Sequence, residues 1–179
     1  MSGPVAPRPG VAGIEDLRAC GFEGFASVGQ LRDEAAASVP VAPGAWIVVR
    51  ESAAALPRFL PRSTASEWRG QDPTMSADAL GVRWVPHACV LYVGVAPGTG
   101  VRHLLQQRVK RFLRFGDGRN VAHWSGRHVW QLASAASLRI AWKVTTPEGA
   151  RGAADELLQV FQEHHGAQPF ANEAGEADE

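Results

Sequence analysis

The sequence predicts an α/β fold in which a small, mostly antiparallel sheet of three or more strands is flanked by helices. Two observations predict it. Short apolar runs bounded by Pro or Gly, which are typical of buried strands, alternate with longer segments in which apolar residues recur at helical spacing. The chain has 179 residues and 45% hydrophobic content, which suits one domain with an ordinary core.

The chain divides into three predicted parts. Residues 1–40 are expected to form an N-terminal extension with short helices, and residues 41–172 the folded domain. Residues 173–179 carry acids and no base. Such runs of like charge stay solvated, so we expect a disordered acidic tail.

Three segments of the domain are predicted as strands. The first, 45–49, follows a Pro/Gly turn, and the second, 90–95, contains Tyr92-Val93-Gly94. We expect these two to pair in antiparallel fashion. The third, 138–144, alternates enough to be a strand with one buried face.

An amphipathic helix is predicted over residues 103–115. At 100° per residue, Leu104, Leu105, Val109, Phe112 and Leu113 fill one half of it. Arg108 falls inside that apolar half. Because burying an unpaired charge costs several kcal/mol, the Arg108 guanidinium must either be paired or face a pocket.

A second long helix is predicted from Pro147 to about residue 165. Proline is favoured in the first turn of a helix, and Gly166 follows as a stop signal. Glu156 lies at the margin of the apolar face of this helix, and Asp155 lies further toward solvent.

The charge is unevenly distributed. The net charge is zero, yet residues 101–128 carry seven Lys or Arg against one acid. This stretch is interpreted either as a phosphate-binding surface or as a solvated helix face. The phosphate interpretation names six residues besides Arg108: Arg102, Lys110, Arg111, Arg114, Arg119 and Arg127.

Other classes of site find little support. No Cys/His pair has the spacing of a zinc site, and the glycines 94, 98 and 100 do not match a dinucleotide-binding loop. No apolar stretch approaches the length of a membrane span, and the N-terminus lacks the apolar region of a signal peptide. We therefore expect a cytoplasmic protein without a membrane partner.

The order of motifs resembles the GIY-YIG nuclease superfamily, which includes homing endonucleases, some restriction enzymes and the incision subunit of nucleotide excision repair. The motifs run from Gly44-Ala45-Trp46 through Tyr92-Val93-Gly94, Arg108 and Glu156 to Asn172. The resemblance covers roughly residues 41–172. Trp46 stands where the family has Tyr, and Phe112 stands where the family often has Tyr or His.

The resemblance implies roles for the matching residues. Tyr92 orients or activates water, and Arg108 stabilises charge on the phosphate that is attacked, for which a bidentate guanidinium is suited. Glu156 holds one Mg²⁺ (or Mn²⁺) ion through a carboxylate and waters, with an ambiguity of one helical turn in the alignment. The alternative is that Glu156 is a solvated helix residue.

Three further residues are assigned with alternatives. Asn172 either orients reactive groups or satisfies local backbone. His123 either transfers protons in place of the missing base or is an ordinary loop histidine. Trp46 fills the place of the first tyrosine and blocks or reshapes water access. Its indole N–H donates a hydrogen bond but the ring offers no acceptor, so it cannot act as a general base.

The function predicted first is metal-dependent cleavage of DNA phosphodiester bonds by a divergent GIY-YIG domain, in DNA repair or defence. Two alternatives stay open. One is a non-catalytic nucleic-acid-binding module on the same fold, and the other is an interaction domain that merely inherited the fold.

Overall fold

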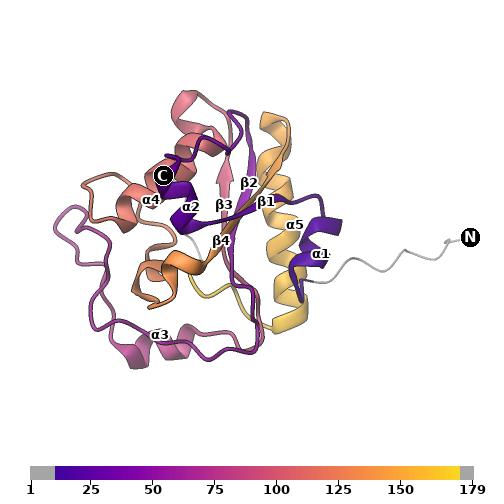
Figure 1. The fold of residues 1–179 in the computed structure, drawn as a ribbon. Helices are drawn as coiled ribbons and strands as arrows, with labels where there is room; N and C mark the ends of the chain where they lie inside the picture. The colour runs from indigo at the N-terminus through magenta and orange to yellow at the C-terminus, as the bar shows by residue number, and fades with distance from the viewer. Residues whose placement is uncertain (1–10, 174–179) are drawn as a thin grey trace, which may run out of the picture.

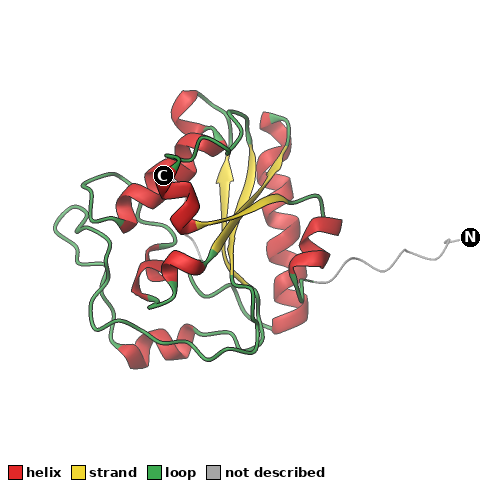
Figure 2. Cartoon of the chain, in the orientation of Figure 1, coloured by secondary structure: helices red, strands yellow, loops and turns green. Residues whose placement is uncertain are grey.

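The computed structural model describes residues 11–173, and the predictions for residues 1–10 and 174–179 lie outside that range. Its centre is one four-stranded sheet with the strand order β1-β4-β2-β3, in which all paired neighbours are antiparallel (Figures 1 and 2). Helices flank this sheet, so the predicted fold class is confirmed. The strands are β1 Glu23–Ser27, β2 Gly44–Val49, β3 Val90–Ala96 and β4 Arg139–Val144.

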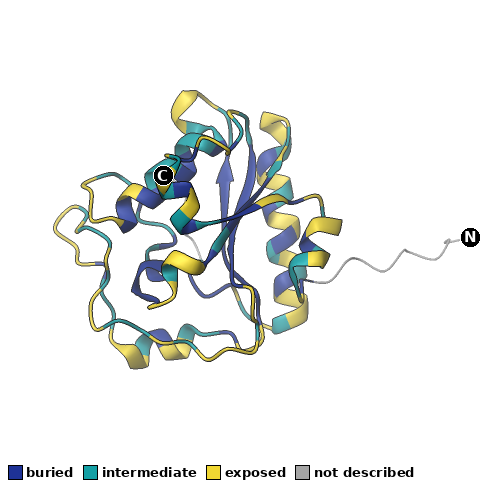
Figure 3. Cartoon of the chain, in the orientation of Figure 1, coloured by how far each residue is buried: buried dark blue, intermediate teal, exposed yellow. Residues whose placement is uncertain are grey.

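The sheet separates two hydrophobic cores. Successive side chains of a strand point to opposite faces, so Trp46 and Val48 of β2 enter one core while Ile47 and Val49 enter the other. Strands β2 and β3 are buried along their whole length (Figure 3). This explains why the two strands read as continuous apolar runs.

One face of the sheet is covered by α5, Pro147–His165, and by the short helix α1, Ile14–Ala19. The Thr146 side chain accepts a hydrogen bond from the Gly149 amide at 3.2 Å and caps the start of α5. Gly166 ends the helix with a left-handed backbone, φ 68°. The predicted limits of this helix are therefore confirmed.

The other face of the sheet is covered by α4 and several shorter elements. Leu105, Val109 and Phe112 of α4 are fully buried in this core. The shorter elements add Leu31, Leu80 and Trp130 to it. These elements are α4 Leu105–Gly116, α2 Val28–Asp33, α3 Ala77–Arg83, η1 Val101–His103, η2 Arg127–Gln131 and η3 Ala135–Ser137.

The N-terminal segment contributes a strand as well as the predicted short helices. Strand β1 pairs with β4, so that Ala26 lies opposite Ile140. Gly24, with φ of 90°, lies beneath the Trp142 ring, and a Cβ there would come within 2.4 Å of it. Residues 11–40 thus belong to the same sheet and cores as the rest. Among the described helices, none is long and apolar enough to cross a membrane.

Candidate functional site

An aromatic cluster on the α4 side of the sheet contains two predicted site residues. The Trp46 ring stands edge-on to Tyr92 and Phe112, at centroid separations of 5.2 and 5.1 Å. A Cβ on Gly94 would come within 2.5 Å of Trp46 Nε1, so the motif glycine makes room for the indole. Trp46 is 1% and Tyr92 2% exposed. Access of a substrate to the phenol therefore requires movement of its neighbours.

A loop closes over this cluster. Gly126, at the end of the loop, has φ of 74°, and a Cβ there would lie 3.2 Å from the Phe112 and Tyr92 rings. The Arg111 guanidinium donates a hydrogen bond to the carbonyl of Ala122. The loop thus contacts both the aromatic cluster, through Gly126, and the side chain of Arg111 on α4, through Ala122.

Arg108 is buried on α4, as its helical phase predicts. It is 5% exposed, and its Nη2 lies 3.3 Å from Nδ1 of His103. Burial lowers the pKa of His103 and of His123, and the charges of Arg108 and Arg111 lower both further. The two guanidiniums, on successive turns of α4, therefore both contribute positive potential around His103 and His123.

His123 is enclosed rather than exposed in its loop. Burial, reinforced by Arg108 and Arg111, lowers its pKa to about 3, so the imidazole is neutral at pH 7. Its ring lies 5.3 Å from Phe112 and 6.1 Å from Trp46, measured between centroids. Within the described part of the chain, neither ring nitrogen has a hydrogen-bond partner. In this conformation His123 is not placed to exchange protons with solvent.

The structure does not bring Glu156 to this site. Glu156 lies on α5, across the sheet from Trp46 and Tyr92, and lines a cavity of about 100 Å³ with Cys20 and Lys143. Among the described residues, no group of three or more His, Cys, Asp or Glu is placed to hold a metal ion. The side chains therefore do not fit a Mg²⁺ or Mn²⁺ ion held between Glu156 and Tyr92.

Asn172 has a structural position at the edge of the sheet. Its Oδ1 accepts from the Val93 amide and its Nδ2 donates to the Val93 carbonyl, both at 2.9 Å. The Ala171 amide donates to the Leu91 carbonyl at 2.8 Å. Residues 171 and 172 thus satisfy the outer edge of β3, which corresponds to the second of the two alternatives given for Asn172.

The predicted phosphate-binding residues lie on α4, just before it, and along the loop that follows. Together with Arg108 they are called the basic surface: Arg102, Arg108, Lys110, Arg111, Arg114, Arg119 and Arg127. Arg102, Arg114 and Arg119 are exposed, and the others are partly or fully buried. The basic surface therefore combines solvent-exposed cations with cations that are partly or fully buried against the fold.

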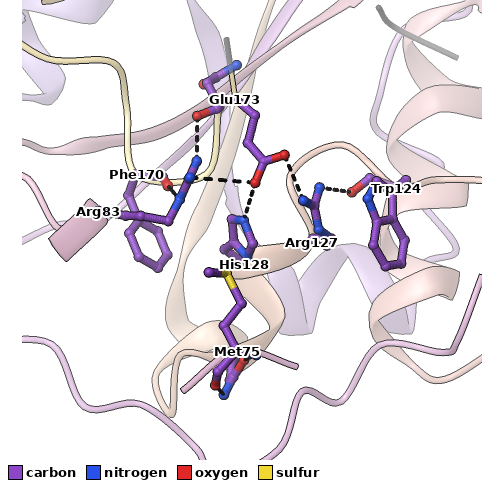
Figure 4. Close-up of polar contacts among 9 residues, drawn as sticks. Met75, Arg83, Trp124, Arg127, His128, Phe170 and Glu173 are labelled. Carbon is purple, nitrogen blue, oxygen red and sulfur yellow. Dashed lines mark hydrogen bonds and ion pairs between the residues drawn. The ribbon is translucent and has the colours of Figure 1, made fainter. Parts of the chain in front are cut away.

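A polar cluster that the sequence analysis missed centres on Glu173 (Figure 4). Its carboxylate lies 2.7 Å from Arg127 Nη2, 2.9 Å from His128 Nε2 and 3.5 Å from Arg83 Nη1. Glu173, the first residue of the predicted acidic tail, thus contacts three residues of the folded domain. The partners lie 45 to 90 positions away in sequence. No local pattern signals such a contact.

No family model, curated protein or solved structure matches this chain. The interpretation of the site therefore depends on the geometry of its own residues.

Proposed function

We propose that the protein binds the phosphate backbone of nucleic acid, most readily DNA, through the basic surface. The observation that carries the proposal is the charge of residues 101–128, which hold seven Lys or Arg against one acid on α4 and the segments on either side of it. Guanidiniums suit this task because their planar donors match phosphate oxygens in pairs.

The arrangement of α4 supports two kinds of contact. Lys110 and the exposed Arg114 lie one turn apart on the same side of the helix. They are suited to phosphates at the solvent boundary. Arg108 and Arg111 lie on the side that carries the loop, and they are suited to hold one phosphate more closely.

Binding is tested by fluorescence anisotropy with a labelled duplex over a range of salt concentrations. Replacing Lys110 and Arg114 together with Gln is expected to weaken binding to all sequences alike. It should also flatten the log–log salt dependence by up to about two units, since each duplex phosphate contact contributes a slope of about −0.9.

The matched control is Arg18→Gln with Arg151→Gln. Both arginines are exposed and lie on α1 and α5, which cover the other face of the sheet. This variant removes the same charge and is expected to bind DNA nearly as the parent does. Equal binding by both double variants, or no binding by the parent at low salt, contradicts the proposal and favours the interaction domain.

Cleavage of the bound phosphodiester is the second candidate function. It is favoured by one observation: Tyr92 is in the core packed against α4, the helix that carries Arg108. In plasmid cleavage assays with Mg²⁺ or Mn²⁺, Arg108→Ala is expected to remove about 3 kcal/mol of transition-state stabilisation. Glu156→Gln is expected to leave the rate unchanged, because Glu156 lies across the sheet. Loss of cleavage in Glu156→Gln would contradict the conclusion that Glu156 lies outside the cleavage site.

A further inference from the structure

The Glu173 cluster has the composition of an anion site. Arg83 comes from the end of α3, while Arg127 and His128 begin η2. All three direct nitrogen atoms at one carboxylate. A phosphate would offer these donors the same kind of acceptor, with more charge and more oxygens.

Two of these donors are fixed by contacts that do not involve Glu173. The Arg127 guanidinium packs over the Trp124 ring at 4.5 Å. The His128 side chain is 0% exposed and lies edge-on to Phe170, 6.3 Å between centroids. Their positions are therefore set mainly by the fold, and they remain in place when another anion replaces the carboxylate.

The neighbourhood leaves room for a larger ligand. A cavity of about 490 Å³ lies beside the cluster, lined among others by Arg83, Phe170, Asn172 and Glu173. Arg127 also belongs to the basic surface. A nucleic-acid strand bound along that surface would thus bring a phosphate toward the carboxylate of Glu173.

We infer that Arg83, Arg127 and His128 form a phosphate-binding subsite that the Glu173 carboxylate fills in the free protein. This inference depends on the proposed function for its physiological ligand, a backbone phosphate. Glu173 competes with that phosphate from within the chain, so the subsite binds nucleic acid only when the carboxylate moves away. The imidazole of His128 donates from Nε2 to an anion when it is protonated or in its neutral Nε2–H tautomer, the tautomer that its contact with the Glu173 carboxylate requires.

The test compares Glu173→Gln with Glu163→Gln. Glu163 is exposed on α5 and bonds to Gln159 at 2.9 Å. Both variants change the net charge equally, but only the first removes the competing carboxylate. Glu173→Gln is expected to bind duplex DNA about fivefold to tenfold more tightly at low salt, with a salt slope steeper by about 0.9, as for one added phosphate contact.

A second measurement uses inorganic phosphate and NMR of the histidine rings. Phosphate is expected to shift the His128 signals of Glu173→Gln at concentrations that leave the parent unchanged. Adding Arg127→Ala to Glu173→Gln should abolish that shift. Circular dichroism and thermal unfolding establish that each variant is folded. If a variant is less stable and its DNA binding changes for that reason, the phosphate titration still reports binding at His128 directly.

The outcomes separate the subsite from the proposed function. Equal gains in Glu173→Gln and Glu163→Gln mean that only long-range charge matters, which overturns the subsite. DNA binding by the parent with no gain in Glu173→Gln overturns the subsite and leaves the proposed function standing. Phosphate binding at His128 without DNA binding by any variant supports the subsite and overturns the proposed function. A phosphate shift that persists with Arg127→Ala also overturns the subsite.

Discussion

The buried imidazole of His123 makes the stability of this protein depend on pH. Its pKa is about 3 in the folded protein, against 6.5 for an ordinary histidine. The unfolded chain therefore binds this proton at a higher pH than the folded chain. The stability is fully present above pH 6.5, and it is lost as the pH falls from there through about 3.

The magnitude follows from the two pKa values. Each pKa unit is worth ~1.36 kcal/mol, so the fall from 6.5 to about 3 corresponds to roughly 5 kcal/mol. About 2 kcal/mol of this is lost between pH 7.5 and pH 5. That is a large share of the stability of a typical domain.

The perturbation is His123→Phe, which keeps an aromatic ring among Trp46, Phe112 and Phe115 but removes both unsatisfied nitrogens. At pH 7.5 we expect the variant to be as stable as the parent or more so, because no polar atom is left unpaired. At pH 5 its advantage should be greater by about 2 kcal/mol, since a phenyl ring has no proton to bind.

The assay is urea unfolding followed by tryptophan fluorescence at pH 7.5, 6 and 5. Burial also lowers the pKa values of His103, His128 and His165. These contribute equally to parent and variant, so the difference between the two proteins isolates His123. His87→Gln, at an exposed position, is the control and should follow the parent. Parallel pH profiles of parent and His123→Phe would refute the reasoning.

Three further predictions concern the sheet and the two cores that it separates. Gly94→Ala should lower the free energy of unfolding by about 1–3 kcal/mol, because its Cβ would press on Trp46 Nε1; urea unfolding measures it. Asn172→Ala should cost about 1–2 kcal/mol in the same assay, since Val93 loses two hydrogen bonds. Cys89 should resist alkylation by iodoacetamide at pH 8 until the chain unfolds, because burial raises the pKa of its thiol to about 11; mass spectrometry detects the adduct.

Each of these predictions has a control within the chain. Gly152→Ala meets no atom within 4 Å and should stabilise α5 by up to about 1 kcal/mol. Asn120→Ala changes an exposed loop amide and should be neutral. Cys20, which is only partly buried, should react before Cys89. A neutral Gly94→Ala, a neutral Asn172→Ala, or simultaneous labelling of the two thiols would contradict the respective argument.

Local pattern was sufficient for several elements of this fold. Pro147 and Gly166 mark the two ends of α5. Proline suits the first turn of a helix and glycine adopts the left-handed backbone that ends one, and both effects act within one turn. Helical phase alone placed Arg108 on the buried side of α4. The apolar runs around Trp46 and Tyr92 indicated the two strands that pair through them.

Other features depend on contacts between distant segments. Strand β1 was not predicted, because Gly21 and Gly24 interrupt its sequence like a turn. Gly24 and Phe25 have positive φ in the structure, and the segment is a strand through its pairing with β4. Helical phase showed that Glu156 lies at the margin of an apolar face, but it does not specify which side of the sheet α5 covers.

The sequence by itself determined the ends of α5, the strands β2 and β3 and the inward position of Arg108, because those follow from periodicity and from the backbone limits of single residues. The tertiary structure alone decided that Glu156 is separated from Tyr92 and that Glu173 joins Arg83, Arg127 and His128. Whether these side chains lie close together depends on which face of the sheet each segment covers. That arrangement is set by burial of apolar area on both faces rather than by any local preference.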